Sequence, residues 1–170
     1  DQTLSSGERG AIADGFANKL KTLEKSLTKE SAYFVVGDKG VEGVRALEER
    51  GVSVRILTNS LVSNDVLAAH AGHANYRKEL LQAGAEVYEF RADADVIERN
   101  WWRPESKAGL HTKAFIFDDE SVFIGSFNLD PRSVNLNTEA GLYVESKEFA
   151  NILRDYMDRG LEQAYRLSLD

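Results

Sequence analysis

One stretch of the chain combines a β-strand pattern with a set of reactive side chains: His111-Thr-Lys113-Ala-Phe-Ile-Phe-Asp118, followed after six residues by Gly125-Ser126-Phe-Asn128. Side chains alternate between the two faces of a strand, so His111 and Lys113 project from the same face. The stretch therefore predicts a strand that presents an imidazole and an ammonium group on one side.

A polar turn follows this strand. The run Asp118-Asp-Glu-Ser121 separates two apolar segments that favour strands, which predicts a β-hairpin. A turn in which Asp118 faces Ser121 gives the same register as a four-residue loop closed by Phe117 and Val122. The directly opposed residues in this register, with Cα atoms ~4.5–5.5 Å apart, are Lys113 with Ser126 and His111 with Asn128.

These side chains suit the cleavage of a phosphodiester. Negative charge develops on the nonbridging oxygens during displacement at phosphorus, and Lys113, Ser126 and Asn128 can stabilise it without a metal ion. An imidazole near its pKa can attack phosphorus and form a covalent intermediate, which makes His111 the predicted nucleophile. Glu139, eleven residues after Asn128, is the candidate carboxylate that orients the ring of His111.

The two segments match the HxKx4Dx6GSxN pattern of the phospholipase D superfamily at every fixed position. The flanking segments ILTNSLVSNDVLAAHAGHANYRKELLQAGAEVYEF and SFNLDPRSVNLNTEAGLYVES resemble bacterial cardiolipin synthases and related phosphatidyltransferases. The similarity runs from about Tyr33 to Ser146. It implies a phospholipase D-like fold.

The resemblance also implies roles and a reaction. His111, Lys113 and Asp118 take the catalytic positions of the motif, with phosphate held by Lys113 and Asn128, although the motif aspartate is more often a structural hydrogen-bonding residue. The implied reaction is phosphatidyl transfer from a phospholipid, through phosphohistidine, to an alcohol or lipid acceptor. Water as the acceptor would make the protein a phospholipase D hydrolase. The implied location is bacterial and peripheral to the inner membrane, on a leaflet that the sequence leaves open.

Enzymes of this superfamily use two copies of the motif, whereas this sequence contains one. The other histidines, His70 and His73, are not followed two residues later by Lys. The second copy is expected either from a homodimer or from the other half of a longer duplicated enzyme. The second alternative is favoured, with residues 1–170 forming a single domain that is inactive alone. A silent half that only supports an active partner is a further alternative.

Composition narrows the function classes. The chain has 170 residues, of which 42% are hydrophobic and 29% charged, as expected for one globular domain. No apolar run approaches the ~18–20 residues that span a bilayer, so membrane contact is expected to be peripheral. With three histidines and no cysteine, neither a metal site nor a cofactor is expected. A net charge of −7 argues against nucleic acid as a partner, although a homodimeric, metal-independent nuclease stays an alternative.

The whole pattern predicts an α/β fold with a mixed β-sheet flanked by helices on both faces. Apolar spacing predicts helices and β-prone runs predict strands. The expected helices are 10–27, 41–50, 65–83 and 149–166, and the expected strands are 32–36, 52–58, 86–90, the two arms of the hairpin and 141–144.

Five further residues are candidates for the substrate pocket. Asn59 and Ser60 follow a predicted strand at its carboxyl end, where α/β sheets bind ligands, and His70 comes shortly after. The alternatives are that Asn59 and Ser60 cap a helix and that His70 is an ordinary packed or surface histidine. Trp101 and Trp102 are adjacent in a polar connector and either reach toward acyl chains or pack on the core.

Overall fold

The computed structural model of the protein describes residues 11–32, 36–60, 76–91, 113–126 and 140–169. Residues 76–82 form a helix. The remaining elements are α1 (Ala11–Lys21), β1 (Ser26–Ser31), α2 (Gly37–Glu49), β2 (Ser53–Asn59), β3 (Glu86–Phe90), β4 (Lys113–Phe117), β5 (Ser121–Gly125), β6 (Gly141–Glu145), α5 (Lys147–Glu162) and β7 (Ala164–Arg166).

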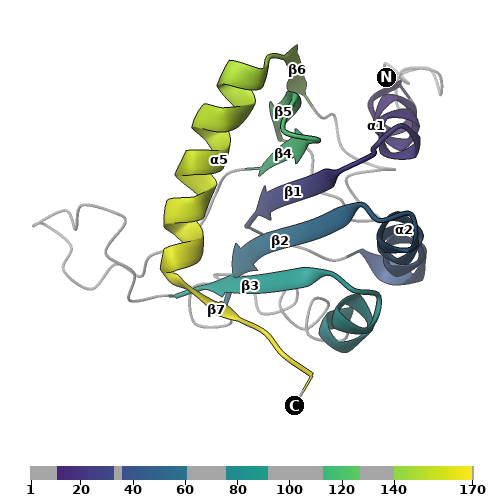
Figure 1. The fold of residues 1–170 in the computed structure, drawn as a ribbon, viewed down its shortest axis with the longest axis vertical. Coiled ribbons are helices and arrows are strands. Elements are labelled where there is room, and N and C mark those ends of the chain that lie inside the picture. The colour runs from purple at the N-terminus through teal and green to yellow at the C-terminus, as the bar shows by residue number, and fades with distance from the viewer. Residues whose placement is uncertain (1–10, 33–35, 61–75, 92–112, 127–139, 170) are drawn as a thin grey trace, which may run out of the picture.

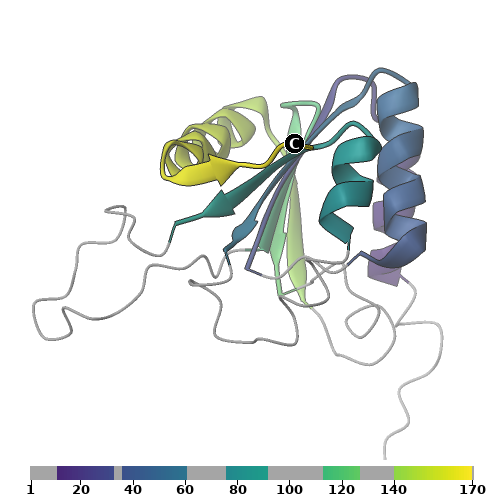
Figure 2. The ribbon, with the colours of Figure 1, turned by 90° about the horizontal axis from the view of Figure 1, so that it is seen from below.

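The strands form one mixed sheet in the order β6-β5-β4-β1-β2-β3-β7 (Figure 1). β1, β2 and β3 are parallel to one another, and the other neighbouring pairs are antiparallel. α5 covers one face, whereas α1, α2 and the helix 76–82 cover the other (Figure 2). The predicted mixed α/β sheet with helices on both faces is confirmed.

The two faces of β4 contribute to two separate cores. Phe115 and Phe117 of β4 belong to the larger core, under α1 and α2. Ala114 and Ile116 belong to the smaller core, under α5. Because both faces of β4 are covered, the strand is apolar at every position after Lys113. Each fully buried phenylalanine or isoleucine side chain contributes roughly 1.5–3 kcal/mol to folding.

The first strand lies earlier than predicted. β1 spans Ser26–Ser31 rather than 32–36, and it contains Lys29 and Glu30. Charged side chains are seldom fully buried, which is why the sequence pattern favoured the apolar run that follows. Both are nevertheless buried, with exposed fractions of 2% and 1%. The Lys29 amine lies 5.2 Å from the centroid of the Phe115 ring, within range of a cation–π contact.

The ends of two predicted helices also differ. α1 ends at Lys21 instead of residue 27, and the guanidinium of Arg50 donates to the carbonyls of Leu20 and Lys21 at this end. α5 ends at Glu162 rather than residue 166. The residues after it form β7, which pairs with β3. A side chain distant in sequence thus binds the end of α1, and pairing with a distant strand follows the end of α5.

The hairpin forms where predicted, but its register differs by one residue. Phe117 pairs with Ser121 around a three-residue loop, whereas the sequence predicted Asp118 opposite Ser121. Asp118 and Asp119 both adopt left-handed backbone conformations, with φ of 54° and 57°. Aspartate tolerates this region better than most residues do. The last hairpin pair is Ala114 with Ile124, so the predicted opposition of Lys113 to Ser126 is wrong.

Candidate active site

A row of polar side chains crosses one edge of the sheet. Ser31 of β1 pairs with Lys113 of β4 on one side and with Thr58 of β2 on the other, and Thr58 pairs with Glu89 of β3. Directly paired residues project from the same face, so the row runs from a charged residue on β4, through hydroxyls on β1 and β2, to a charged residue on β3. The carboxyl ends of the parallel strands β1, β2 and β3 lie here, as expected for a ligand site in an α/β sheet.

Lys113, predicted to bind phosphate, is therefore the charged member of this row on β4. Its side chain is partly buried. The other members were not predicted, because they come together only through the pairing of strands that are distant in sequence. Charged residues inside otherwise apolar runs, such as Lys29, Glu30 and Glu89, were the available signal.

Buried charge is concentrated near this edge. Lys29 and Glu30 lie just before Ser31, the last residue of β1, and Glu89, which is 6% exposed, is the next-to-last residue of β3. Arg77, from the helix 76–82, forms an ion pair with Glu89. Burial of charge is costly unless the charge is paired, so several buried charges are unusual near the ends of strands.

Three parts of the chain converge at the same edge, and each is next to another residue that the sequence predicted for the site. Lys113 begins β4, Ser126 directly follows β5, and Ala140 directly precedes β6. The Ser126 amide donates to the Ala140 carbonyl at 2.9 Å, which extends the β5–β6 ladder. The predicted residues next to these points, His111, Asn128 and Glu139, lie outside the described residues, as do His70, Trp101 and Trp102.

The side chain of Ser126 is engaged by the backbone of Ala140. Its hydroxyl accepts a hydrogen bond from the Ala140 amide at 3.0 Å and lies 3.3 Å from the Ala140 carbonyl oxygen, to which it donates. The hydroxyl predicted to bind phosphate thus joins the end of β5 to the start of β6. This contact fixes the position of the chain two residues before Asn128 and one residue after Glu139.

Asn59 and Ser60 lie at the carboxyl end of β2 and are both buried, with exposed fractions of 5% and 8%. The Ser60 amide lies 3.3 Å from the carbonyl oxygen of Phe90, to which it donates. The two residues thus continue the parallel β2–β3 ladder at the edge where the polar row lies.

Asp118 directly follows β4, at the opposite end of the strand from Lys113. Its carboxylate accepts hydrogen bonds from the backbone amides of Glu24, Lys25 and Ser26, at 3.1, 2.8 and 2.9 Å. Burial acts to raise the pKa of Asp118, but the bonds from these amides, together with the nearby Lys19 amine, outweigh it and hold the pKa below its ordinary value. The carboxylate thus ties the turn of the hairpin to the start of β1.

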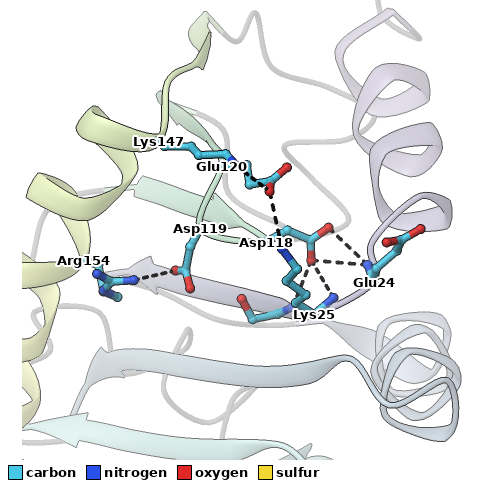
Figure 3. A network of polar contacts seen from close by, with 8 residues as sticks. Glu24, Lys25, Asp118, Asp119, Glu120, Lys147 and Arg154 are labelled. Carbon is cyan, nitrogen blue, oxygen red and sulfur yellow. Dashed lines mark hydrogen bonds and ion pairs between the residues drawn. The ribbon is translucent and has the colours of Figure 1, made fainter.

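The other acidic residues of this turn form ion pairs with basic side chains of α5 and of the segment before β1. Asp119 forms an ion pair with Arg154 at 3.2 Å. Glu120 lies 3.1 Å from the Lys147 amine and 3.4 Å from the Lys25 amine, and its hydrogen bonds to both hold its pKa below the ordinary value. All three carboxylates of the turn thus fasten the hairpin to neighbouring elements (Figure 3).

Within the described ranges, no group of three or more His, Asp or Glu side chains is arranged to hold a metal ion. No helix in the same part of the chain is long and apolar enough to cross a membrane.

Comparison with known proteins matches this chain to one family. The family described as "Cardiolipin synthase, PLD-like domain" matches residues 17–161. Cardiolipin synthase C of Escherichia coli is 42% identical over 144 residues, which are 82% of this chain and 30% of that protein. Cardiolipin synthase B of Salmonella typhi is 30% identical over 147 residues, or 86% of this chain and 32% of that protein.

A solved structure confirms the fold. The phospholipase D family member Nuc from Salmonella typhimurium superposes with a TM-score of 0.70, over 95% of this chain and 93% of that chain, at 18% identity. An identity this low supports the fold alone.

The fold and the family match define a phospholipase D-like domain. Since the family match covers most of the sequence, the chain belongs to the family of cardiolipin synthase, phospholipase D-like domains. It spans about a third of the length of the curated relatives that it matches.

Proposed function

We propose that the chain is one catalytic half of a phosphatidyltransferase that acts on phospholipids through a phosphohistidine intermediate. The observation that carries this proposal is the position of Lys113 in the polar row at the carboxyl ends of β1, β2 and β3, where Ser126 and Ala140 also converge. The similarity to cardiolipin synthases supports a phospholipid as the substrate.

In the proposed reaction an imidazole nitrogen of His111 forms a bond to the phosphorus of the phospholipid. The bond from phosphorus to the headgroup oxygen breaks, and the leaving alcohol takes a proton from an acid on the second half. An acceptor alcohol then loses its proton, attacks phosphorus and releases the imidazole. Covalent catalysis of this kind divides one difficult displacement into two easier ones.

Each motif residue has a proposed part in this reaction. Lys113 and Asn128 stabilise the negative charge on the nonbridging oxygens, and Glu139 orients the ring of His111. Asp118 takes a structural role, because three backbone amides occupy its carboxylate at the far end of β4. Ser126 positions the chain that leads to Asn128 through its bonds to Ala140.

The proposal includes a partner and a location. A second copy of the motif supplies the acid and base, either from the other half of the same longer polypeptide or from a second chain. The short span of the chain relative to its curated relatives favours the first arrangement. We propose that the protein lies at the surface of the bacterial inner membrane, where its lipid substrate would be.

Product analysis tests the reaction. The intact protein is incubated with phosphatidylglycerol in excess, with and without His111→Ala. Transfer is expected to yield cardiolipin and free glycerol, with an acid-labile phosphorylated histidine trapped in the wild type only. Phosphatidic acid as the sole product would identify a hydrolase instead. Undiminished activity of the His111→Ala protein would identify this half as catalytically silent.

A homodimeric, metal-independent nuclease is the second candidate, which the sequence left open. Plasmid cleavage in the presence of a chelator tests it directly. The formal net charge of −7 leads us to expect no cleavage. Cleavage that disappears in the His111→Ala protein would replace the lipid substrate with nucleic acid.

A further inference from the structure

A groove lies between α1 and the strands β4, β5 and β6, on the face of the sheet that carries the larger core. Its walls include the aromatic side chains of Phe16, Phe117, Phe123 and Tyr143, and the groove has a volume of about 600 Å³. This volume lies within the ~300–1,000 Å³ that is usual for small-molecule sites. The lining is largely apolar, as ligand pockets are.

The groove begins in the same row of the sheet as Lys113. Ala114 is the last residue of β4 paired with β5, at Ile124, so the next positions along these strands are Lys113 and Gly125. Gly125 pairs in turn with Gly141 of β6. Residues that alternate with Ala114 and Ile124 face the larger core, so Lys113 and the two glycines lie on the face that holds the groove.

The two glycines leave room for the ring of Phe123 in the row of the sheet that contains Lys113. A Cβ atom on Gly141 would lie 2.1 Å from the ring of Phe123, and one on Gly125 would lie 2.4 Å from the Ala140 carbonyl oxygen. The Phe123 ring therefore lies directly over the backbone of Gly141. No side chain from either glycine stands between Lys113 and the aromatic floor of the groove.

The far end of the groove is polar. The Lys19 amine lies 6.0 Å from the centroid of the Phe117 ring and 5.9 Å from that of Tyr143, and Glu145 also lines this end. From Gly141 to Glu145 the strand advances roughly 14 Å. The apolar part thus fits a segment of alkyl chain that starts near Lys113 and ends below the Lys19 amine.

We propose that this groove binds an alkyl chain of the phospholipid whose phosphate is held at Lys113. The inference rests on the proposed function for its substrate, and it adds the place where the lipid tail lies. A phosphate on Lys113 brings the first carbons of the tail to the glycine row, from which the aromatic rings offer continuous apolar contact. Burial of each methylene group there favours binding through the hydrophobic effect.

Gly15 allows the groove to be filled without disturbing the fold. It lies on α1, lines the groove, and has no neighbouring atom within 4 Å of a Cβ placed on it. Gly15→Leu therefore adds an isobutyl group to the groove and removes a glycine from a helix, which favours folding. Gly43→Leu is the matched control, since Gly43 is an exposed glycine of α2 with equally open surroundings and is not among the groove residues.

The test measures binding and turnover in the intact protein. Dodecyl phosphate, below its micelle concentration, and butyl phosphate are titrated calorimetrically into the wild type and both variants. Gly15→Leu is expected to weaken dodecyl phosphate binding about tenfold or more, the effect of losing roughly two buried methylenes, with butyl phosphate unaffected. The same variant is expected to lower turnover of dioleoyl relative to dihexanoyl phosphatidylglycerol. Gly43→Leu should match the wild type throughout.

Equal affinities of the Gly15→Leu and Gly43→Leu proteins for dodecyl phosphate would overturn the inference. So would a change of oligomeric state in Gly15→Leu alone, measured by light scattering, because it would assign the groove to a protein contact. A wild type that turns over neither lipid rejects the proposed function, whereas the titrations still decide whether the groove takes an alkyl chain.

Discussion

The carboxylate of Asp118 accepts a 2.8 Å hydrogen bond from the backbone amide of Lys25, ninety-three residues earlier in the chain. Two further amides bind the same carboxylate, and the motif position that would be read as catalytic thus holds the hairpin against the start of β1. Lys113, five residues earlier, lies at the other end of the same strand. One short motif therefore contains both a structural end and a proposed reactive end.

Replacement of Asp118 is expected to lower stability but not the specific activity of the folded protein. Asp118→Ala removes acceptors for three amides, at about 1–3 kcal/mol, and places alanine in a left-handed conformation, at roughly a further 1–2 kcal/mol. Asp118→Asn keeps an amide oxygen and tolerates the backbone conformation, so its loss should be smaller. Urea denaturation gives the stabilities, and phospholipid turnover per folded molecule gives the activity.

The matched control is Asp119→Asn, which weakens only the surface ion pair with Arg154. Its effect is expected to stay below about 1 kcal/mol. If the Asp118→Asn protein were fully stable but inactive, Asp118 would belong to the catalytic machinery.

The lowered pKa of Asp118 predicts a loss of stability in acid. Because its folded pKa lies below the unfolded value of about 3.9, the unfolded state binds more protons in the interval between the two pKa values. The stabilisation is fully present above the unfolded pKa and is lost as the pH falls through the folded pKa. Glu120 acts in the same direction.

Urea midpoints measured from pH 7 down to pH 2.5 test this sign. The curve of the wild type should fall below about pH 4, and that of Asp118→Asn should fall less over the same range. Parallel curves for the two proteins would show that Asp118 does not contribute to acid sensitivity.

Lys113→Met is expected to reduce phospholipid turnover by about 10²-fold or more, because a fixed cation at the developing charge is lost. The fold should persist, since Lys113 is only partly buried at the start of its strand. Lys147→Met removes an exposed amine near the opposite end of the hairpin and should leave turnover unchanged. Equal activity of both variants would remove Lys113 from the proposed site.

Gly141→Ala is expected to destabilise the protein by about 1–3 kcal/mol, because the added methyl group would overlap the ring of Phe123. Gly43→Ala, on an open helical surface, should instead be neutral or stabilising. Thermal denaturation of the two variants measures the difference. Gly141→Ala with an unchanged melting temperature would show that the Phe123 ring moves aside easily.

The sequence predicted the strands of the hairpin and β3 well, because their apolar β-prone runs are bounded by turn residues. The register of the hairpin could not be predicted, since it depends on the left-handed backbone of Asp118 and Asp119. The side chain of Asp118 binds backbone amides at the start of β1, and that of Asp119 pairs with Arg154 of α5. β1 was predicted too late in the sequence because two buried charges interrupt its apolar pattern.

The candidate site could be predicted only in part, because it depends on contacts between strands that are distant in sequence. Lys113 was identified from the motif, whereas Ser31, Thr58 and Glu89 join it through strand pairing. No local pattern in the sequence marks a residue that matters because of its neighbours on other strands. The groove beside α1 likewise depends on which strands are adjacent.

The central place of β1 in the sheet has a consequence for how the protein is made. β1 pairs on one side with β2, which follows soon after it, and on the other with β4, so that Leu27 meets Phe117. Closing such a long loop is slow compared with local pairing. During synthesis, therefore, the backbone groups on one side of β1 have no strand partner until β4 leaves the ribosome. Only then can the polar row that contains Lys113 form.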